Sequence, residues 1–205
     1  MNLKFEKAKL NSGVRYVIGC DEVGRGSLAG PVVACAVALD INCKSMGLGE
    51  VKDSKQLLPA KRRELSALIK ERVCAWAVAE VQPATIDKMN IHHATLLAMR
   101  RAVEKILKAV PSETCLVCVD GKFIIPKFGI KQQAVVGGDN KIFSIAAASI
   151  VAKVHRDKLM EKLDKVYPEY GFAKHKGYGT LHHRQAIKKS GMSPVHRKTF
   201  CSHLV

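Results

Sequence analysis

The order of short β-prone runs and long helical patterns constrains the fold of this 205-residue chain more than any other feature. Five runs have the length and the apolar, β-branched composition of strands: 15–20, 31–39, 74–81, 115–119 and 133–136. Longer segments place apolar residues three and four apart, as amphipathic helices do: 59–73, 90–110, 145–166 and 181–189. This order predicts an α/β domain in which helices flank a central, mixed, five-stranded sheet.

The length agrees with one domain. From residue 167 the chain is rich in glycine, histidine and lysine, so we expect a main domain over 1–166 and a C-terminal helical extension over 167–205, packed on that same domain. The longest apolar run, 31–39, is far shorter than the ~20 residues that a membrane helix needs. Residues 1–10 lack the apolar core of a signal peptide. We therefore expect a cytoplasmic protein that has no membrane partner.

The net charge of +16 comes from 34 basic and 18 acidic side chains. Residues 151–205 hold 12 of the basic and 4 of the acidic residues, so this short C-terminal part carries half of the net charge. A positive field of this kind attracts polyanions, which favours nucleic acid as the partner. Two alternatives stay open on charge alone: a non-catalytic basic nucleic-acid binder, and a basic surface that is simply solvated.

The seven cysteines are odd in number and irregular in spacing, which argues against a disulfide framework. Cys115 and Cys118 form a C-x-x-C inside a predicted strand, where positions three apart point to opposite faces. Since no second cysteine pair completes a zinc site, we expect buried, reduced thiols.

Acidic residues at the ends of predicted strands stand out in a chain this basic. Asp21 and Glu22 close the first strand, Asp120 closes the fourth, and Asp139 follows two glycines after the fifth. Adjacent carboxylates at the end of a buried strand repel each other unless something neutralises them, and oxygen ligands suit Mg²⁺ or Mn²⁺. If the first and fourth strands are neighbours, four carboxylates can hold two metal ions for phosphoryl transfer to water. For Asp120 taken alone, ordinary turn chemistry is the alternative.

The loop that follows the first two acids, 24–29, reads GRGSLA and matches the G-x-G-x-x-A pattern of dinucleotide-binding sites. That pattern requires a helix after the glycines, whereas Gly30, Pro31 and a β-prone run follow here. A nucleotide-cofactor oxidoreductase is therefore a poor alternative. Glycines beside an arginine do let the backbone approach a ligand and place a guanidinium on a phosphate.

Several segments follow one another in a specific order: 21–26 (DEVGRG), 52–57 (KDSKQL), 90–95 (NIHHAT), 119–121 (VDG), 138–139 (GD), 147–157 (AASIVAKVHRD) and 175–180 (HKGYGT). In these motifs the chain resembles ribonuclease HII, the type 2 ribonuclease H family, over nearly its whole length. It departs from the family at Leu58, where a serine helix cap is common.

The resemblance implies a ribonuclease H-like fold, with 1–166 as the catalytic domain and 167–205 as a substrate-binding extension. It implies endonucleolytic cleavage of RNA in RNA–DNA hybrids and at single ribonucleotides embedded in duplex DNA. The products would carry 3′-hydroxyl and 5′-phosphate ends, and the cofactor would be Mn²⁺ or Mg²⁺, with two ions when substrate is bound.

The resemblance also assigns site residues. By this resemblance, the metal ligands and catalytic residues would be the four acids, Asp21, Glu22, Asp120 and Asp139. The loop that senses the 2′-hydroxyl at the RNA-to-DNA junction is formed by Gly24, Arg25 and Gly26. The ring of Tyr178 would pack on the sugar of the following deoxynucleotide and exclude a ribose. A 2′-hydroxyl is the group that distinguishes RNA from DNA.

Four further residues are predicted to contact the substrate: Ser54, Lys55, His93 and Lys176. Lys55 is a phosphate contact or an ordinary exposed lysine, and His93 either faces the site or caps a helix. The doublet Lys188–Lys189 could extend the phosphate track.

Other polar residues of the last third of the chain receive no role in the metal site. We interpret Arg156 and Asp157 as a structural ion-pair element, and the six histidines after residue 150 as surface or phosphate-adjacent groups. The expected partner is an RNA–DNA hybrid or a ribonucleotide-containing duplex, bound by a monomer. A sliding clamp stays open as a protein partner, without a visible motif to support it.

Overall fold

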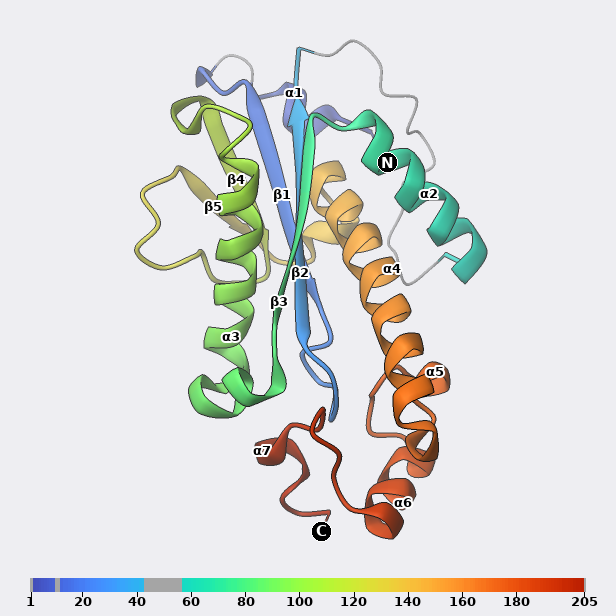
Figure 1. The fold of residues 1–205 in the computed structure, drawn as a ribbon. Coiled ribbons are helices and arrows are strands. Elements are labelled where there is room, and N and C mark those ends of the chain that lie inside the picture. The colour runs from blue at the N-terminus through green and yellow to red at the C-terminus, as the bar shows by residue number, and fades with distance from the viewer. Residues whose placement is uncertain (1, 10–11, 43–56, 205) are drawn as a thin grey trace.

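The computed structural model describes residues 2–9, 12–42 and 57–204 (Figure 1). Ser54 and Lys55, predicted as substrate contacts, lie outside the described residues.

A five-stranded sheet in the order β3-β2-β1-β4-β5 forms the centre of the fold. Its strands are β1 (Tyr16–Val23), β2 (Val32–Asp40), β3 (Ala75–Val81), β4 (Cys115–Asp120) and β5 (Gln132–Val135). The first three strands pair antiparallel, whereas β4 pairs parallel with both β1 and β5. The predicted mixed sheet is therefore confirmed, and each strand lies within two or three residues of its predicted range.

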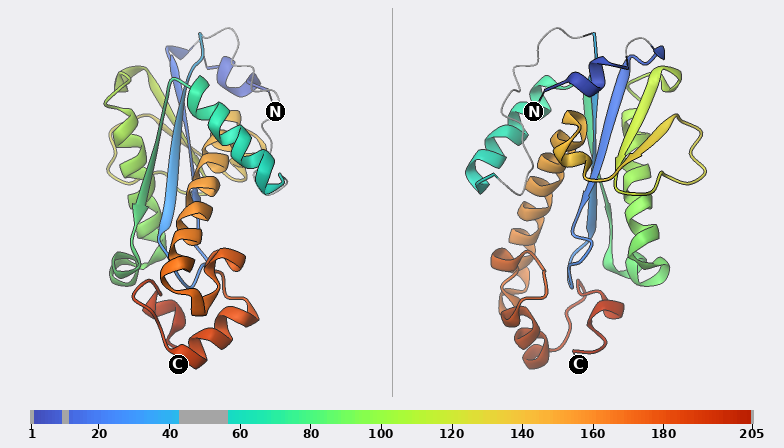
Figure 2. Two further views of the ribbon diagram at one scale, coloured as in Figure 1. Left: turned by 45° about the vertical axis from the view of Figure 1, so that its right-hand side comes forward. Right: turned by 180° about the vertical axis from the view of Figure 1, so that it is seen from behind.

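Long helices cover both faces of the sheet (Figure 2). The helices are α1 (Lys4–Lys7), α2 (Pro59–Arg72), α3 (Pro83–Ile106), α4 (Phe143–Val166), α5 (Phe172–His175), α6 (Leu181–Ser190) and α7 (Lys198–Cys201). Helix α3 packs on one face, and α4 with α2 packs on the other. Among the described residues, no helix is long and apolar enough to cross a membrane.

A glycine in β1 allows α4 to lie directly on the sheet. A Cβ added at Gly19 would lie 2.1 Å from the carbonyl carbon of Ser144 in the first turn of α4. Only glycine leaves room for this approach, so α4 starts directly against the middle of β1 and then runs along the sheet. That course carries its later residues past the carboxyl end of β1.

Helix α3 begins earlier than the predicted helix over 90–110, because two helical segments join at Asn90. Asn90 has φ 66° and ψ 164°, and its side-chain oxygen accepts hydrogen bonds from the backbone N–H groups of His92 and His93. Asn90 thus caps the second segment, as asparagine commonly does at a helix start.

The C-terminal part, from Tyr167 on, packs around a small core that it shares with the rest of the chain. This core joins Ala29 and Met160 to aromatic and aliphatic residues of the C-terminal part: Tyr170, Phe172, Ile187 and Cys201. The prediction that the late histidines lie at the surface is wrong for His183 and His196, which are buried. Both rings pack against Phe172, at centroid distances of 5.4 and 5.6 Å.

The six cysteines within the described residues are free thiols, as predicted. Cys115 packs into the cluster under α3, and Cys118 packs on the opposite face of β4. The C-x-x-C is therefore part of the core.

Candidate active site

The parallel pairing of β1 with β4 brings acids together that are 99 positions apart in the chain. The register pairs Cys20 with Val119, so Asp21 and Asp120 follow side by side at the carboxyl ends of the two strands. Glu22 is the next residue of β1. Oxygen atoms of Asp21, Glu22 and Asp120 all lie within 4.8 Å of one another.

Asp139 approaches this triad from a separate turn. The 3₁₀ turn η4 (Gly138–Asn140) follows β5, and the backbone N–H of Gly138 donates to Oδ1 of Asp120 at 2.7 Å. Asp139 is buried and lines the same pocket as the triad, but it is not within the 4.8 Å group. The structure therefore brings three of the four predicted acids into one cluster and the fourth to its edge.

The carboxylates of the triad are held close with little compensating charge. Burial raises the pKa of Asp21 well above its usual value, and the charges of Glu22 and Asp120 add to this shift, against a hydrogen bond from Ser149. Burial also raises the pKa of Glu22, although Arg25 opposes it with an Nη1–Oε1 contact of 3.3 Å. A cluster of hard oxygen donors that repel one another fits a divalent cation.

The triad opens into a pocket of about 380 Å³. Its wall is formed by acids and by four further side chains: Val23, Ser149, Lys153 and Tyr178. The Tyr178 side chain is partly exposed, and its ring lies 5.7 Å from the Arg156 guanidinium. Lys153, to which the sequence assigned no role, forms an ion pair with Asp157 at 2.8 Å.

Two fully buried arginines hold the glycine-rich loop beside the triad. Arg197 donates to the carbonyl oxygens of Gly24 at 2.6 Å and Arg25 at 2.7 Å, and twice to Gly30. Gly24 has φ +89°, and a Cβ there would lie 2.2 Å from Nε of Arg156. The loop is therefore fixed from within the protein.

The second arginine, Arg156, donates to the carbonyls of Ala29 and Pro31 in the same loop, and to that of Lys176. Its role is structural, but the predicted ion-pair element is wrong for Arg156, because its hydrogen-bond partners are carbonyls. Asp157 pairs instead with Lys153 and Arg62.

The anchored carbonyls fix the direction of the loop amides. No peptide bond among the described residues is cis, and in a trans peptide the C=O and the next N–H point in opposite directions. With the carbonyls of Gly24 and Arg25 turned inward to Arg197, the N–H groups of Arg25 and Gly26 point outward. A Cβ added at Gly26 meets nothing within 4 Å, so the space beside the Cα of Gly26 is open.

This loop does not have the geometry of a dinucleotide-binding turn. Strand β2 starts at Val32, directly after Gly30 and Pro31, where that motif needs a helix. The oxidoreductase alternative therefore lacks its structural context.

A chain of hydrogen bonds links the buried histidines to Tyr178. The backbone N–H of Ser193 donates to Nδ1 of His196, whose Nε2 lies 3.0 Å from Nε2 of His183. Nδ1 of His183 lies 2.9 Å from the Tyr178 carbonyl oxygen, which can only accept. Both rings are therefore neutral, with His183 protonated on Nδ1 and His196 on Nε2. No sequence signal beyond the histidine count indicated this arrangement.

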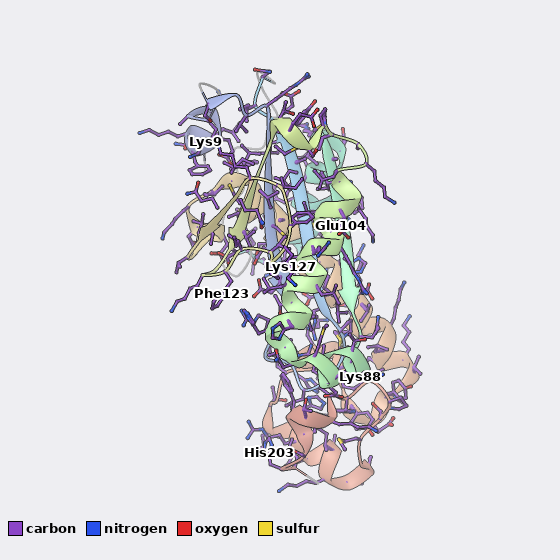
Figure 3. All side chains as sticks on the ribbon, turned by 90° about the vertical axis from the view of Figure 1, so that its left-hand side faces the viewer. Lys9, Lys88, Glu104, Phe123, Lys127 and His203 are labelled. Atoms are coloured by element: carbon purple, nitrogen blue, oxygen red, sulfur yellow. The ribbon has the colours of Figure 1, made fainter. Side chains whose placement is uncertain are left out.

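The remaining predicted contacts lie outside the pocket of the triad. His93 is exposed, with its Nδ1 3.0 Å from the Asn90 side-chain nitrogen and 3.2 Å from the Met89 carbonyl oxygen. Its neighbour His92 instead lines a smaller pocket with Glu22 and packs edge-on against Phe123. Phe123 is exposed and is labelled in Figure 3.

Lys176 also faces away from the triad. Its Nζ pairs with Glu161 at 2.7 Å, and its backbone is left-handed, with φ 52°. It lines a separate, more basic pocket beside α4.

The fold and the acidic cluster define an enzyme of the ribonuclease H-like class, a metal-dependent endoribonuclease. The family model "Ribonuclease HII" matches residues 18–203. The chain belongs to the ribonuclease HII family, as its motifs indicated, and the family supports ribonuclease H activity on RNA–DNA substrates.

Curated relatives named ribonuclease HII match most of the chain. The Chlorobium luteolum protein is 47% identical over 186 residues, covering 90% of this chain and 88% of its own. The Thiobacillus denitrificans protein is 50% identical, covering 93% of this chain and 90% of its own.

Solved structures agree in fold. The Archaeoglobus fulgidus RNase HII, solved in a complex with PCNA, superposes with a TM-score of 0.73 at 28% identity, over 92% of this chain and 96% of its own. Bst-RNase HIII in complex with Mn²⁺ has a TM-score of 0.69 at 22% identity, and the match covers 98% of this chain and 68% of its own. This match shows a shared fold.

Proposed function

We propose that this enzyme cleaves the RNA strand of RNA–DNA hybrids and also cuts at single ribonucleotides embedded in duplex DNA, leaving 3′-hydroxyl and 5′-phosphate ends. One observation carries the proposal: outward-pointing N–H groups of Arg25 and Gly26 lie beside a cluster of three carboxylates. The acids supply a site for hydrolysis, and the neighbouring loop supplies donors for a 2′-hydroxyl.

The metal site is proposed to consist of Asp21, Glu22, Asp120 and Asp139, which would hold two divalent ions, Mn²⁺ or Mg²⁺. Such ions lower the pKa of an attacking water and stabilise the charge that develops on the phosphate and the leaving oxygen. The protein's own part is to hold the ligands in place. Ser149 bonds to Asp21, and the backbone of Gly138 bonds to Asp120.

Substrate selection is proposed to use the loop and the ring together. The amides of Arg25 and Gly26 would bond to the 2′-hydroxyl, and the Arg25 guanidinium would contact a phosphate. Tyr178 would pack against the next sugar and favour a deoxyribose there, because a 2′-hydroxyl would crowd the ring, so junctions would be cut faster than positions inside an RNA strand. Ser54, Lys55, His93 and Lys176 remain proposed contacts to the flanking strands.

The proposal extends to the domains, the location and the oligomeric state of the enzyme. Residues 1–166 form the catalytic domain and residues 167–205 the extension that supports Tyr178, and the enzyme acts in the cytoplasm as a monomer. The clamp-bound structure of the Archaeoglobus fulgidus relative is the support for a sliding-clamp partner. We leave the clamp out of the proposal, because we find no clamp-binding motif in this sequence.

The test uses three labelled duplexes: all DNA, DNA with one ribonucleotide, and an RNA–DNA hybrid. We expect cleavage of the last two in Mn²⁺ or Mg²⁺, no cleavage of the first, and no cleavage in EDTA. The product ends are checked by ligation and by phosphatase treatment. Cutting of the all-DNA duplex at a comparable rate, or cutting in EDTA, would refute the proposal.

A further inference from the structure

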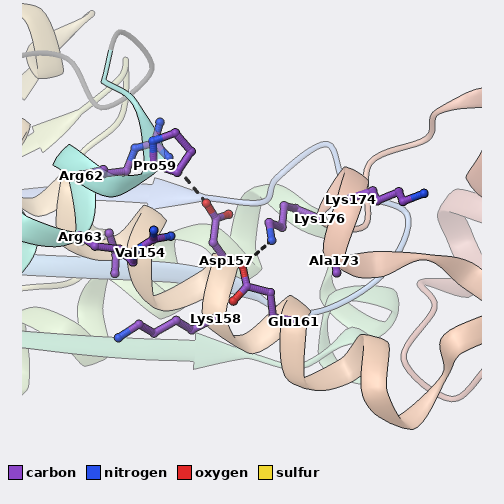
Figure 4. A pocket seen from close by; sticks show the side chains of 10 residues that line it. All are labelled: Pro59, Arg62, Arg63, Val154, Asp157, Lys158, Glu161, Ala173, Lys174 and Lys176. Atoms are coloured by element: carbon purple, nitrogen blue, oxygen red, sulfur yellow. Dashed lines mark hydrogen bonds and ion pairs between the residues drawn. The ribbon is translucent and has the colours of Figure 1, made fainter.

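A second pocket lies between α2, α4 and α5, apart from the carboxylate triad (Figure 4). Its volume is about 540 Å³, larger than that of the pocket around the triad. Helix α4 contributes Val154, Asp157, Lys158 and Glu161, which share one face of the helix because they are three or four positions apart. The pocket is therefore built on the same helix that passes the active site.

The pocket is strongly basic. Five cationic side chains line it, against two carboxylates: Arg62, Arg63, Lys158, Lys174 and Lys176 face Asp157 and Glu161. A concave site with this excess of positive charge attracts anions and concentrates them.

Both carboxylates of the pocket are already paired. Asp157 pairs with Lys153 at 2.8 Å and with Arg62 at 3.7 Å. Glu161 pairs with Lys176 at 2.7 Å. The two acids are therefore engaged by Lys153, Arg62 and Lys176, and they leave the other cations of the pocket uncompensated.

Those other cations are Arg63, Lys158 and Lys174. All three side chains are exposed, and none has an acidic partner among the residues that the structure describes. They come from three different helices, α2, α4 and α5, and they line one pocket. Three free cations around one hollow are suited to phosphate groups.

The basic pocket adjoins the active site through two short links. Lys153 lines the pocket of the triad, and its partner Asp157 lines the basic pocket. On the other side, Lys176 and Tyr178 are two residues apart and line the basic pocket and the pocket of the triad, respectively. A nucleic-acid strand that leaves the triad along α4 would place its next phosphates in the basic pocket.

We infer that this basic pocket binds backbone phosphates of the duplex on one side of the cleavage point, through Arg63, Lys158 and Lys174. The inference rests on the proposed function. It adds a site that contacts phosphates and makes no contact with a base or a 2′-hydroxyl. The ligand chemistry is phosphate, which a free polyphosphate could also supply. Continuity with the pocket of the triad is the reason for assigning it to the bound duplex.

The test is a triple variant, Arg63→Gln/Lys158→Gln/Lys174→Gln. Its matched control, Lys7→Gln/Arg101→Gln/Lys108→Gln, removes the same charge from α1 and from the end of α3 and its following turn, which lie far from the extension (Figure 1). Two duplexes are compared, each with one ribonucleotide. One has a long flank on its 5′ side and a flank of a few base pairs on its 3′ side, and the other has the reverse.

For the pocket variant we expect about tenfold weaker binding to one of the two duplexes and wild-type binding to the other. On the affected duplex, the slope of log affinity against log salt should fall by about 2 to 3, as the loss of three phosphate contacts predicts. Turnover at saturating substrate should stay unchanged, because none of the three residues lines the pocket of the triad.

Equal weakening on both duplexes, or the same weakening in the control variant, would overturn the inference. A second pair of results would also overturn it. In that case the pocket variant binds both duplexes normally, and tripolyphosphate raises the melting temperature of the wild type but not that of the variant. That result would assign the pocket to a free phosphate compound. A wild-type enzyme that fails to cut either duplex would refute the proposed function instead.

Discussion

Arg197 donates from Nη2 to the carbonyl oxygen of Gly24 across 2.6 Å, although 173 positions separate the two residues in the chain. Through this bond the C-terminal part of the chain fixes the loop beside the carboxylate triad. The guanidinium is fully buried and bonds to three carbonyls, so its position and that of the loop depend on each other.

Replacing Arg197 by lysine tests this dependence. Lysine keeps the charge but loses the planar fork that reaches Gly24, Arg25 and Gly30 at once. Hydrogen bonds to charged groups are worth about 1.5–3 kcal/mol each, so we expect a clear loss of thermal stability. Among molecules that stay folded, kcat/KM on a single-ribonucleotide duplex should fall at least about tenfold, with Mn²⁺ affinity unchanged. A variant with wild-type kcat/KM would show that the loop does not need this anchor.

The two glycines of the loop should respond differently to alanine. At Gly24 a Cβ would collide with Arg156 at 2.2 Å, and the positive φ would be strained, so Gly24→Ala should lower the melting temperature strongly. At Gly26 a Cβ points into open space, so Gly26→Ala should fold like the wild type. If the nucleic acid approaches this side, Gly26→Ala should still weaken substrate binding. Normal melting with normal KM for Gly26→Ala would count against the loop as a recognition element.

Tyr178→Ala removes the ring that faces the pocket of the triad. Stacking of a base on an aromatic ring is worth about 1–3 kcal/mol. We expect the packing of Tyr178 on a sugar to be of similar size, so cleavage at single ribonucleotides should fall roughly tenfold to a hundredfold. Tyr178→Phe is the control and should retain most of the activity. Isothermal titration with Mn²⁺ should give wild-type affinity for both variants. A matching loss of metal affinity would mean that the ring belongs to the metal site.

The fold could be predicted in large part because its information is local. Alternation and periodicity gave the five strands and the long helices. The adjacency of the first and fourth strands was only a condition of the predicted metal site, and the parallel pairing of β1 with β4 meets it. The kink at Asn90 was missed, because a single left-handed residue leaves the helical spacing of its neighbours intact.

The interior of the site could not be predicted from the sequence. Arginine is usually exposed and histidine is intermediate, and nothing near Arg197 or His196 in the sequence signals burial. Arg197 binds carbonyls that lie about 170 positions earlier, and backbone carbonyls carry no sequence signature. Only the packing of the extension onto residues 24–31 makes these side chains internal.

The buried pair His183 and His196 predicts an acid-sensitive fold. Burial lowers the pKa of each to about 4, against about 6.5 in the unfolded chain, so the folded state holds the neutral form. The contribution of the pair to stability is complete above pH 6.5 and is lost as the pH falls toward 4. We expect the free energy of unfolding to decrease by about 2 kcal/mol or more across this range.

The matched variant for this prediction is His196→Gln, whose amide can still donate to His183. Its stability should depend less steeply on pH between 6.5 and 4 than that of the wild type, as measured by urea unfolding at each pH. Parallel profiles for the two proteins would show that the histidine pair does not cause the acid sensitivity.

The most direct test of the central claim, that the carboxylates at the ends of β1 and β4 bind the metal for catalysis, is the cleavage rate of Asp120→Asn on a single-ribonucleotide duplex. Asparagine keeps an oxygen that can accept the bond from Gly138, so the fold should survive and the melting temperature of the metal-free protein should rise as repulsion is relieved. With Mn²⁺ or Mg²⁺ we predict a rate at least about a hundredfold below that of the wild type. A wild-type rate for Asp120→Asn would contradict the account.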